Sequence, residues 1–551
     1  MRYSIPYLII SLFFIFSCTP DEKEKDNRTI FSYNEMNGLA SLDPASASSF
    51  ESIWPVNQLF NGLVQMDDKL NVIPSIAYRF SVSNDGLIYT FNLRNDVYFH
   101  DNVCFEKDGK GRKVIAKDFV FSFDRLFDSK VSSATTLLNN IDRSEKSLYK
   151  GFVAINDSTL KIYLKEPFSA FLSVLTMKFF SVVPYEAIEY YKIEFRRNPV
   201  GTGPFTFKLW EDGTKLVMLK NTNYFEKDEK GNRLPYLDAV SVSFLKDRET
   251  AFLELLKGRF DMLSGADAFN SDAVLNKDGN LREEYTKKFY LQKETYLKTD
   301  YIGILIDENI EIVKNSPLKL KAVRQAINYA FDRDKLIKNL RGNIGTPAHA
   351  GFIPKGMKSY DVEKVKGYYY DPEKTRVLLA EAGFPNGKGL PEITLHATDI
   401  YKTQVEFIQS QLAENNIKIQ VSMEKASVLR QAINSCEYNL FKKNWVGDYA
   451  DEENFMNLFY SKNFCPQGVN YTHYKNPEFD KAYEKALREN NDTIKRNLYQ
   501  KMDQMIVDDA PVIPLYYDQV IRLVHHNIKG LTTNPMNLLN LKTVIKEKEI
   551  K

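Results

Sequence analysis

The chain has 551 residues, of which 74 are basic and 72 acidic, so the formal net charge is +2, and 43% of the residues are hydrophobic. This near-neutral balance, with no long basic stretch interleaved with aromatic residues, argues against nucleic acid as a partner. The length exceeds the roughly 250–300 residues at which one hydrophobic core stops growing, so we expect at least two lobes.

The N-terminus has the pattern of a lipoprotein signal peptide. Arg2 precedes an apolar run over residues 7–16, which is followed by Ser17-Cys18. About ten residues at 1.5 Å each reach roughly 15 Å, half of the ~30 Å hydrocarbon core of a bilayer, so this run is too short to span a membrane. We expect residues 1–17 to be removed and Cys18 to be lipidated. An ordinary signal peptide with an incidental cysteine is the alternative.

The segment after the signal peptide is polar and charged. Residues 18–29 contain almost no apolar side chains, which predicts a disordered tether. No later segment reaches about eighteen apolar residues without charge, so the lipid on Cys18 would be the only membrane anchor.

The remainder alternates short β-rich runs with amphipathic helices, which predicts an α/β fold with mixed sheets. Residues 158–164 alternate like a strand, and residues 319–331 carry apolar side chains at helical spacing. Residues 372–382 are predicted to form a helix that begins at a proline and ends before Gly383.

A glycine pair marks a sharp turn in the middle of the chain. Gly201 and Gly203 flank Thr202 and lead into Pro204, followed by apolar residues that alternate as in a strand: Phe205, Phe207 and Leu209. Because β-forming residues follow instead of a helix, this is not a phosphate-binding loop. We predict a structural role for both glycines.

Signatures of metal sites and catalysis are missing from the sequence. Two turn-forming segments, 105–113 and 225–233, contain carboxylates, but neither has the ligand spacing of an EF-hand, and the sequence has no Cys-x-x-Cys motif. The adjacent His525 and His526 lie in a β-like run, where neighbours face opposite sides. There is no Gly-x-Ser-x-Gly elbow and no His-Glu-x-x-His helix. The sequence therefore predicts that the protein has no metal site and no cofactor and is not an enzyme. The alternative is a hydrolase with an unrecognised catalytic triad.

Several motifs occur in one order between about Leu42 and about Tyr517, and together they resemble the family 5 extracellular solute-binding proteins of ABC transporters, the dipeptide- and oligopeptide-binding group. Each motif is weak alone, and the shared order makes the match specific. The motifs are Leu42-Asp-Pro, Asn61-Gly-Leu-Val, Asp85-Gly-Leu-Ile-Tyr-Thr-Phe, Ala116-Lys-Asp-Phe-Val-Phe-Ser, Asn198-Pro-Val-Gly-Thr-Gly-Pro-Phe, Lys321-Ala-Val-Arg-Gln-Ala-Ile-Asn, Tyr370-Asp-Pro-Glu-Lys-Thr-Arg and Trp445-Val-Gly-Asp-Tyr-Ala-Asp-Glu-Glu-Asn-Phe.

The resemblance implies a bilobal periplasmic-binding-protein fold of class II, with two hinge crossovers and an extra domain inserted in lobe I. Hinges let two lobes close on a ligand and bury it. We place the crossovers near residues 296–307 and 510–517. The expected division is lobe I at 30–66, 197–295 and 513–545, an inserted domain at 67–196, and lobe II at 296–512.

The resemblance also implies a ligand site around Trp445-Val-Gly-Asp-Tyr. In the peptide-binding relatives the aspartate at this position pairs with the free α-amino group of the ligand, which assigns that role to Asp448. Trp445 would form an apolar wall, Gly447 would allow close approach, and Tyr449 completes the set. In the alternative interpretation Asp448 caps the following helix, with help from Asp451, and Trp445 is a core residue.

The implied function is that of a substrate-binding lipoprotein of an ABC importer. It would capture short peptides and deliver them to permease subunits in the inner membrane, as a monomer anchored in the bacterial cell envelope and facing the periplasm. A nickel chelate, haem, an oligosaccharide or a cell-wall peptide is the alternative cargo. The partner of the ligand carboxylate is left open among Arg341, His349 and Lys355.

Three cysteines remain after Cys18. Cys436 and Cys465 fall in the same predicted lobe and are the favoured pair for a disulfide over Cys104, but spacing alone does not establish the geometry of a bond.

Overall fold

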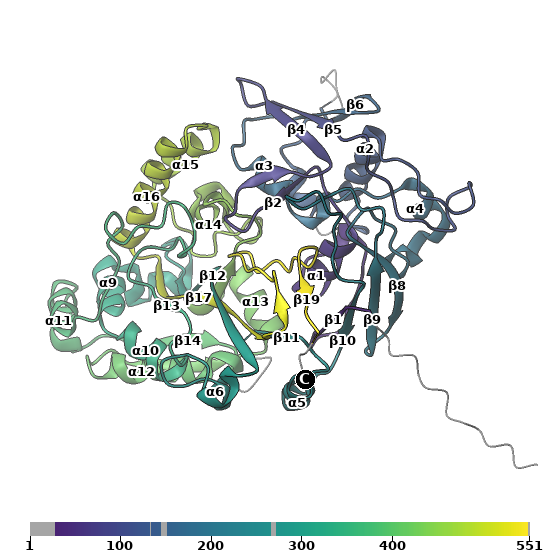
Figure 1. Cartoon of the computed structure of the whole chain (residues 1–551). Helices are drawn as coiled ribbons and strands as arrows, with labels where there is room; N and C mark the ends of the chain where they lie inside the picture. The colour runs from purple at the N-terminus through teal and green to yellow at the C-terminus, as the bar shows by residue number, and fades with distance from the viewer. Residues whose placement is uncertain (1–27, 133, 145–150, 266–270, 549–551) are drawn as a thin grey trace, which may run out of the picture.

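The computed structural model describes residues 28–132, 134–144, 151–265 and 271–548, and its centre is an 11-stranded sheet (Figure 1). The strands are β1 (Ile30–Asn34), β8 (Phe205–Glu211), β9 (Lys215–Lys220), β10 (Ala239–Ser243), β11 (Met262–Ser264), β12 (Phe289–Ile304), β13 (Thr346–Pro347), β14 (Ile393–Ala397), β15 (Ile419–Met423), β16 (Leu440–Val446) and β17 (Val512–His525). Their order is β15-β14-β16-β12-β17-β11-β1-β10-β9-β8, with β13 beside β17. β1 is parallel to β10 and β11, and β14 is parallel to β15 and β16. The remaining pairs are antiparallel, so the sheet is mixed, as predicted.

Three small antiparallel sheets and the helices complete the described fold. The first sheet has the order β4 (Ala77–Val82), β5 (Ile88–Leu93), β7 (Thr159–Tyr163), β6 (Phe152–Asn156), and the others pair β2 (Val64–Met66) with β3 (Val72–Pro74) and β18 (Ile528–Lys529) with β19 (Ile545–Lys546). Before β12 come α1 (Phe50–Leu59), α2 (Ala116–Asp124), α3 (Phe171–Val174), α4 (Tyr185–Tyr191), α5 (Arg248–Leu256), α6 (Ser271–Val274) and α7 (Glu283–Thr286). After it come α8 (Glu311–Lys314), α9 (Lys321–Tyr329), α10 (Arg333–Leu340), α11 (Pro372–Glu381), α12 (Lys402–Ala413), α13 (Ala426–Asn434), α14 (Glu453–Met456), α15 (Pro477–Arg488) and α16 (Asp492–Asp509).

Two long strands, β12 and β17, connect two groups of elements. The first group contains the elements before β12 together with β18 and β19, and the second group contains the elements between β12 and β17. β12 has 16 residues and β17 has 14, and they pair with each other along most of their length. The second half of β12 also pairs with β16, whereas the far end of β17 pairs with β11. Their register shifts between Thr295 and Thr299, where the strands pass from one group to the other. The predicted crossovers, 296–307 and 510–517, overlap these strands; their action as hinges stays a prediction.

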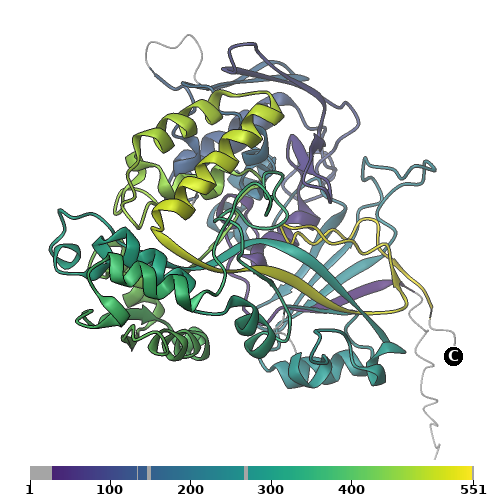
Figure 2. The ribbon, with the colours of Figure 1, turned by 90° about the vertical axis from the view of Figure 1, so that its left-hand side faces the viewer.

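Separate hydrophobic cores lie on the two sides of these strands. The first core is formed mainly by side chains between residues 31 and 244, and it includes side chains of the small β4-β5-β7-β6 sheet, such as Phe91 and Leu160. Two other cores are formed by residues after 296. Figure 2 shows the long strands side by side, between the green helices of the second group and the purple and teal elements of the first.

The local predictions for helices and one strand are confirmed. Residues 158–164 contain β7, residues 319–331 contain α9, and residues 372–382 contain α11. Asp371 caps α11 by accepting a hydrogen bond from the backbone N–H of Lys374. One detail differs, because Leu320 precedes the first turn of α9 and is exposed instead of joining the core.

The predicted alternation after the glycine pair is wrong in its last member. Phe205 is buried, but the register between β8 and β9 shifts between Phe207 and Leu209. A β-bulge changes which face the following side chains occupy. As a result Leu209 is 40% exposed, and Trp210 is buried in its place.

The two glycines themselves have the predicted structural role, since they lie against the end of α1. A Cβ on Gly201 would lie 2.0 Å from the carbonyl oxygen of Leu59, and one on Gly203 would lie 2.3 Å from that of Gln58. The backbone N–H of Gly203 donates a hydrogen bond to the Leu59 carbonyl at 2.9 Å. The close approach of two backbones therefore requires glycine.

The predicted signal peptide and Cys18 lie outside the described residues, as does most of the predicted tether. Its last residue, Thr29, is held by Asp238, whose carboxylate accepts hydrogen bonds from both the backbone N–H and the hydroxyl at 2.9 Å. In the described part of the chain, no helix combines the length and the apolar character needed to cross a membrane.

Replacing Gly203 with alanine should lower the free energy of unfolding by about 1–3 kcal/mol, because the added methyl group forces the turn away from α1. Gly38→Ala is the matched control, because nothing lies within 4 Å of a Cβ added there. Urea denaturation of the two variants and the wild type measures the difference. Equal losses of stability in both variants would contradict this role of Gly203.

Candidate ligand-binding site

A cavity of about 470 Å³ lies between the two groups of elements. Its volume falls in the range of pockets that bind small molecules, about 300–1,000 Å³. One wall comes from the first group, and the facing wall comes from the end of β16. The lining includes Phe50 and Ile53 of α1, Met177, Lys178 and Phe179, then Gly447 and Asp448, and finally Met536.

Asp448 presents a carboxylate to this cavity. Its side chain is accessible from the cavity, and among the described residues its carboxylate has one hydrogen-bond partner, the side-chain amide of Asn454 at 3.4 Å. The surrounding protein removes water from the carboxylate and so raises its pKa, a rise that the Asn454 amide offsets only in part. A desolvated carboxylate without a cationic partner is unfavourable, which makes it a receptor for a cation.

Asn454, on α14, positions two of the predicted site residues. Its side-chain oxygen accepts hydrogen bonds from the backbone N–H of Asp448 at 3.0 Å and from the indole N–H of Trp445 at 3.1 Å. Sequence reasoning missed this residue, although it lies within the motif that begins at Trp445, because nothing in the spacing shows where its amide points.

The alternative interpretation of Asp448 as a helix cap is wrong. The N-cap of α14 is Glu452, whose side chain makes no capping hydrogen bond. The carboxylate of Asp451 instead accepts a hydrogen bond from the backbone N–H of Glu453 at 3.0 Å. Asp448 takes no part in this cap and is left available to the cavity.

The other three predicted residues have different surroundings. Gly447 lines the cavity, and a Cβ there would lie 3.3 Å from the ring of Phe455, so glycine allows this part of the wall to pack tightly. Trp445 is half-buried against a core of the second group, and Tyr449 is 4% exposed, with its hydroxyl donating to the carboxylate of Glu453. Trp445 and Tyr449 are not among the residues that line the cavity, so their contact with a ligand stays a prediction.

Lys178, from the first group, is a basic residue that lines the cavity. Burial lowers the pKa of Lys178 to about 8, and the like charge of Lys542 adds to the decrease. In the described part of the chain, no carboxylate or hydrogen-bond acceptor is paired with this ammonium. One cavity therefore contains both a carboxylate and an ammonium that lack an opposite charge.

Sequence reasoning did not identify Lys178 and considered three other basic residues. Arg341 is bound to Asp518 at 2.6 Å, and the imidazole of His349 contacts Asp334 at 2.9 Å. None of the three, Lys355 included, lines the cavity.

Comparison with known proteins identifies the family. Residues 71–464 match the family model described as "Bacterial extracellular solute-binding proteins, family 5 Middle". The chain belongs to this family. The resemblance found in the sequence is thus confirmed, and because members are solute-binding proteins, the chain is a binding protein and not an enzyme, as predicted.

Individual relatives agree with this assignment. The glutathione-binding protein GsiB of Shigella flexneri is 27% identical over 504 residues, covering 90% of each chain. The periplasmic binding protein DppA from Helicobacter pylori, solved with the peptide STSA, has a TM-score of 0.74 at 27% identity and covers 95% of this chain and 99% of its own. HbpA2 from Haemophilus parasuis has a TM-score of 0.80 at 22% identity and covers 94% of this chain and 100% of its own. These matches confirm the class II periplasmic-binding-protein fold with mixed sheets.

Asp448→Asn should stabilise the ligand-free protein at neutral pH. The folded-state pKa of Asp448 is raised above the unfolded value of about 3.9, so its contribution to stability is complete below about pH 4 and is lost as pH rises through the folded-state pKa. Asparagine removes this loss. The excess Tm of the variant over the wild type, measured by thermal unfolding, should therefore grow as pH rises above about 4 and stop growing once pH exceeds the folded-state pKa. A difference that does not change with pH would contradict the assignment.

Proposed function

We propose that the protein is the substrate-binding subunit of an ABC importer, and that it captures short peptides with free termini between its two lobes. The observation that carries this proposal is the pair of uncompensated charges, Asp448 and Lys178, in one cavity. A peptide with free ends brings an ammonium group for the carboxylate and a carboxylate for the ammonium. Each of these partly desolvated charges then gains the partner that the protein alone does not supply.

The remaining walls suit peptide side chains. Apolar groups of the same cavity come from Phe50, Ile53, Met177, Phe179 and Met536. Apolar walls with a few placed polar groups are typical of ligand pockets, where the polar groups fix orientation. The relatives support this cargo, since GsiB is named for glutathione and DppA was solved with a peptide.

The proposed capture mechanism is closure of two lobes about the long strands. Lobe I would consist of residues 30–66, 197–295 and 513–545, with the inserted domain at 67–196, and lobe II of residues 296–512. The separate cores and the cavity lined from both sides support this division. Closure would surround the ligand with protein and remove it from solvent.

The proposed location is the bacterial cell envelope, facing the periplasm, with the lipid on Cys18 as anchor and a permease in the inner membrane as partner. Two observations support this location: the sequence of residues 1–18, and membership of a family described as extracellular solute-binding proteins. The protein would act as a monomer, and ATP hydrolysis would belong to other subunits.

Native mass spectrometry of the chain from Thr19 onward, purified gently, tests the cargo directly. Release and fragmentation of bound species should give a ladder of short peptides. A single non-peptide mass, such as a nickel chelate, a haem or an oligosaccharide, would overturn the peptide assignment while leaving the family intact.

Variants at the two charged residues test the recognition of peptide termini. Asp448→Asn should weaken binding of a free tripeptide by about 2–5 kcal/mol, because it leaves the ligand ammonium without a partner. The same variant should bind an N-acetylated tripeptide no more weakly than the wild type does. Lys178→Met should behave in the same way towards free and C-amidated tripeptides.

Isothermal titration calorimetry measures these affinities. Lys481→Met is the matched control, because its side chain is 75% exposed and is not among the residues that line the cavity. If either charged residue can be replaced without loss of affinity for the free tripeptide, its proposed role in recognising a terminus is wrong.

A further inference from the structure

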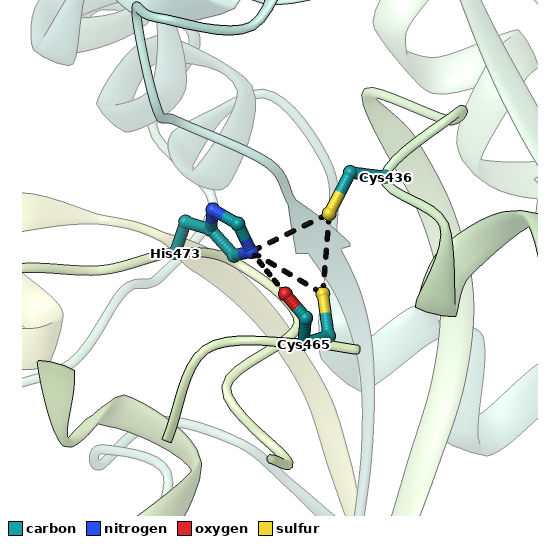
Figure 3. A group of neighbouring side chains, drawn as sticks. All are labelled: Cys436, Cys465 and His473. Atoms are coloured by element: carbon teal, nitrogen blue, oxygen red, sulfur yellow. Dashed lines mark hydrogen bonds between the residues drawn. The ribbon is translucent and has the colours of Figure 1, made fainter. Parts of the chain in front are cut away.

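Two cysteines and a histidine meet in the second group of elements, outside the cavity (Figure 3). The sulfur atoms of Cys436 and Cys465 are 3.3 Å apart, and each lies 3.4 Å from Nε2 of His473. Cys436 follows α13, whereas the other two residues lie in the segment that precedes α15. The three ligand atoms thus converge from two separate parts of the chain.

The separations fit a tetrahedral metal ion. Bonds of about 2.3 Å from zinc to sulfur and about 2.0–2.1 Å to nitrogen, at tetrahedral angles, place two sulfurs about 3.8 Å apart and sulfur about 3.6 Å from nitrogen. The observed separations of 3.3 Å and 3.4 Å are shorter than these values by about half an ångström or less. A disulfide requires about 2.05 Å between the sulfurs, and both cysteines are free thiols here.

A carboxylate orients the histidine for this purpose. Nδ1 of His473 lies 3.1 Å from a carboxylate oxygen of Asp307, and the ring of Phe464 stacks on the imidazole at 4.3 Å between centroids. A carboxylate behind the imidazole is the usual outer partner of a metal-binding histidine, because it fixes the tautomer and turns the other nitrogen towards the ion. Nε2 also lies 3.0 Å from the carbonyl oxygen of Cys465, and a bound ion would take the place of a proton at that nitrogen.

The backbone holds two of these residues in an uncommon conformation. Cys436 has φ of 59° and His473 has φ of 51°, both in the left-handed region. Cys436 occupies the position just after α13 at which helices commonly have glycine, and its N–H bonds back to the Ile433 carbonyl at 3.1 Å. Cys436 therefore has a side chain at a position where the backbone conformation favours glycine.

We propose that Cys436, Cys465 and His473 bind a thiophilic transition-metal ion of the Zn²⁺ type, with Asp307 as the outer partner of the histidine. Two thiolates and one imidazole form a donor set that favours such ions over Mg²⁺ or Ca²⁺. Three protein ligands leave a fourth position for water. The ion would tie the end of α13 to the segment before α15. The proposal is independent of the peptide cargo, and it differs from the expectation of no metal site because the ligands form no contiguous motif.

Metal titration of the purified, reduced protein, stripped with a chelator, tests this site. Co²⁺ should bind with a stoichiometry of one, with the visible absorption of a tetrahedral ion and thiolate-to-cobalt charge transfer, and Zn²⁺ should displace it. Cys465→Ser and His473→Ala should lose these bands, whereas the control variants Cys104→Ser and His526→Ala should keep them. Asp307→Asn should weaken the binding by about 10–100-fold.

Cys436→Gly separates the metal site from the folding of the chain. Glycine suits the left-handed position after α13, so this variant should unfold at a temperature no lower than that of the metal-free wild type. It should nevertheless lose the cobalt bands. Thiol counting before and after reduction tests for a disulfide. A Cys436–Cys465 disulfide, together with no cobalt uptake by the reduced protein, would overturn the proposal. Uptake that Cys436→Gly and Cys465→Ser leave unchanged would overturn it as well.

Discussion

A fully buried ion pair lies where the two groups of strands meet. The ammonium of Lys442 on β16 is 2.6 Å from the carboxylate of Asp300 on β12, and both side chains are 0% exposed. Lys298 contacts Asp300 at 3.3 Å and Asp518 on β17 at 2.8 Å, and Arg341 contacts Asp518 at 2.6 Å. Removing one member of a buried pair leaves an isolated charge and costs about 3–5 kcal/mol. This network therefore fixes the positions of the three strands relative to one another.

The cavity depends on that arrangement, but its charged side chains differ from those of the network because they lack an oppositely charged partner in the described part of the chain. β16 carries Lys442 in its interior and ends at Val446, so the buried pair also fixes the start of the turn that presents Asp448. Within the network every charge has an opposite charge nearby. At the cavity, Asp448 and Lys178 are partly desolvated without one in the described part of the chain, and their pKa values shift towards the neutral forms. Stability is thus given up at the place where a ligand can restore it.

The sequence predicts those features that depend on neighbouring residues. The periodicity that places α9 and α11 is local, and the motif around Asp448 brings that residue to the cavity wall. The role of Lys178 could not be predicted in the same way. It depends on the cavity that Lys178 shares with the end of β16, which is remote in sequence, and not on the residues next to Lys178 in the chain. Asn454 lay inside the motif, but its role depends on the direction of one amide. At Leu209 a bulge reversed the expected face, since strand register is set by the partner strand.

Tyr449 connects the cavity wall of the second group to the core of the first group. Its chain position belongs to the second group, yet its ring is buried in the core of the first. Its hydroxyl donates a hydrogen bond to the carboxylate of Glu453 on α14, which also accepts one from Tyr483, so the ring stays connected to the second group at its hydroxyl end. Moving the ring out of that core would expose it to water, which is unfavourable. Because Tyr449 directly follows Asp448, the burial of this ring holds the carboxylate next to the first group, at the wall of the cavity.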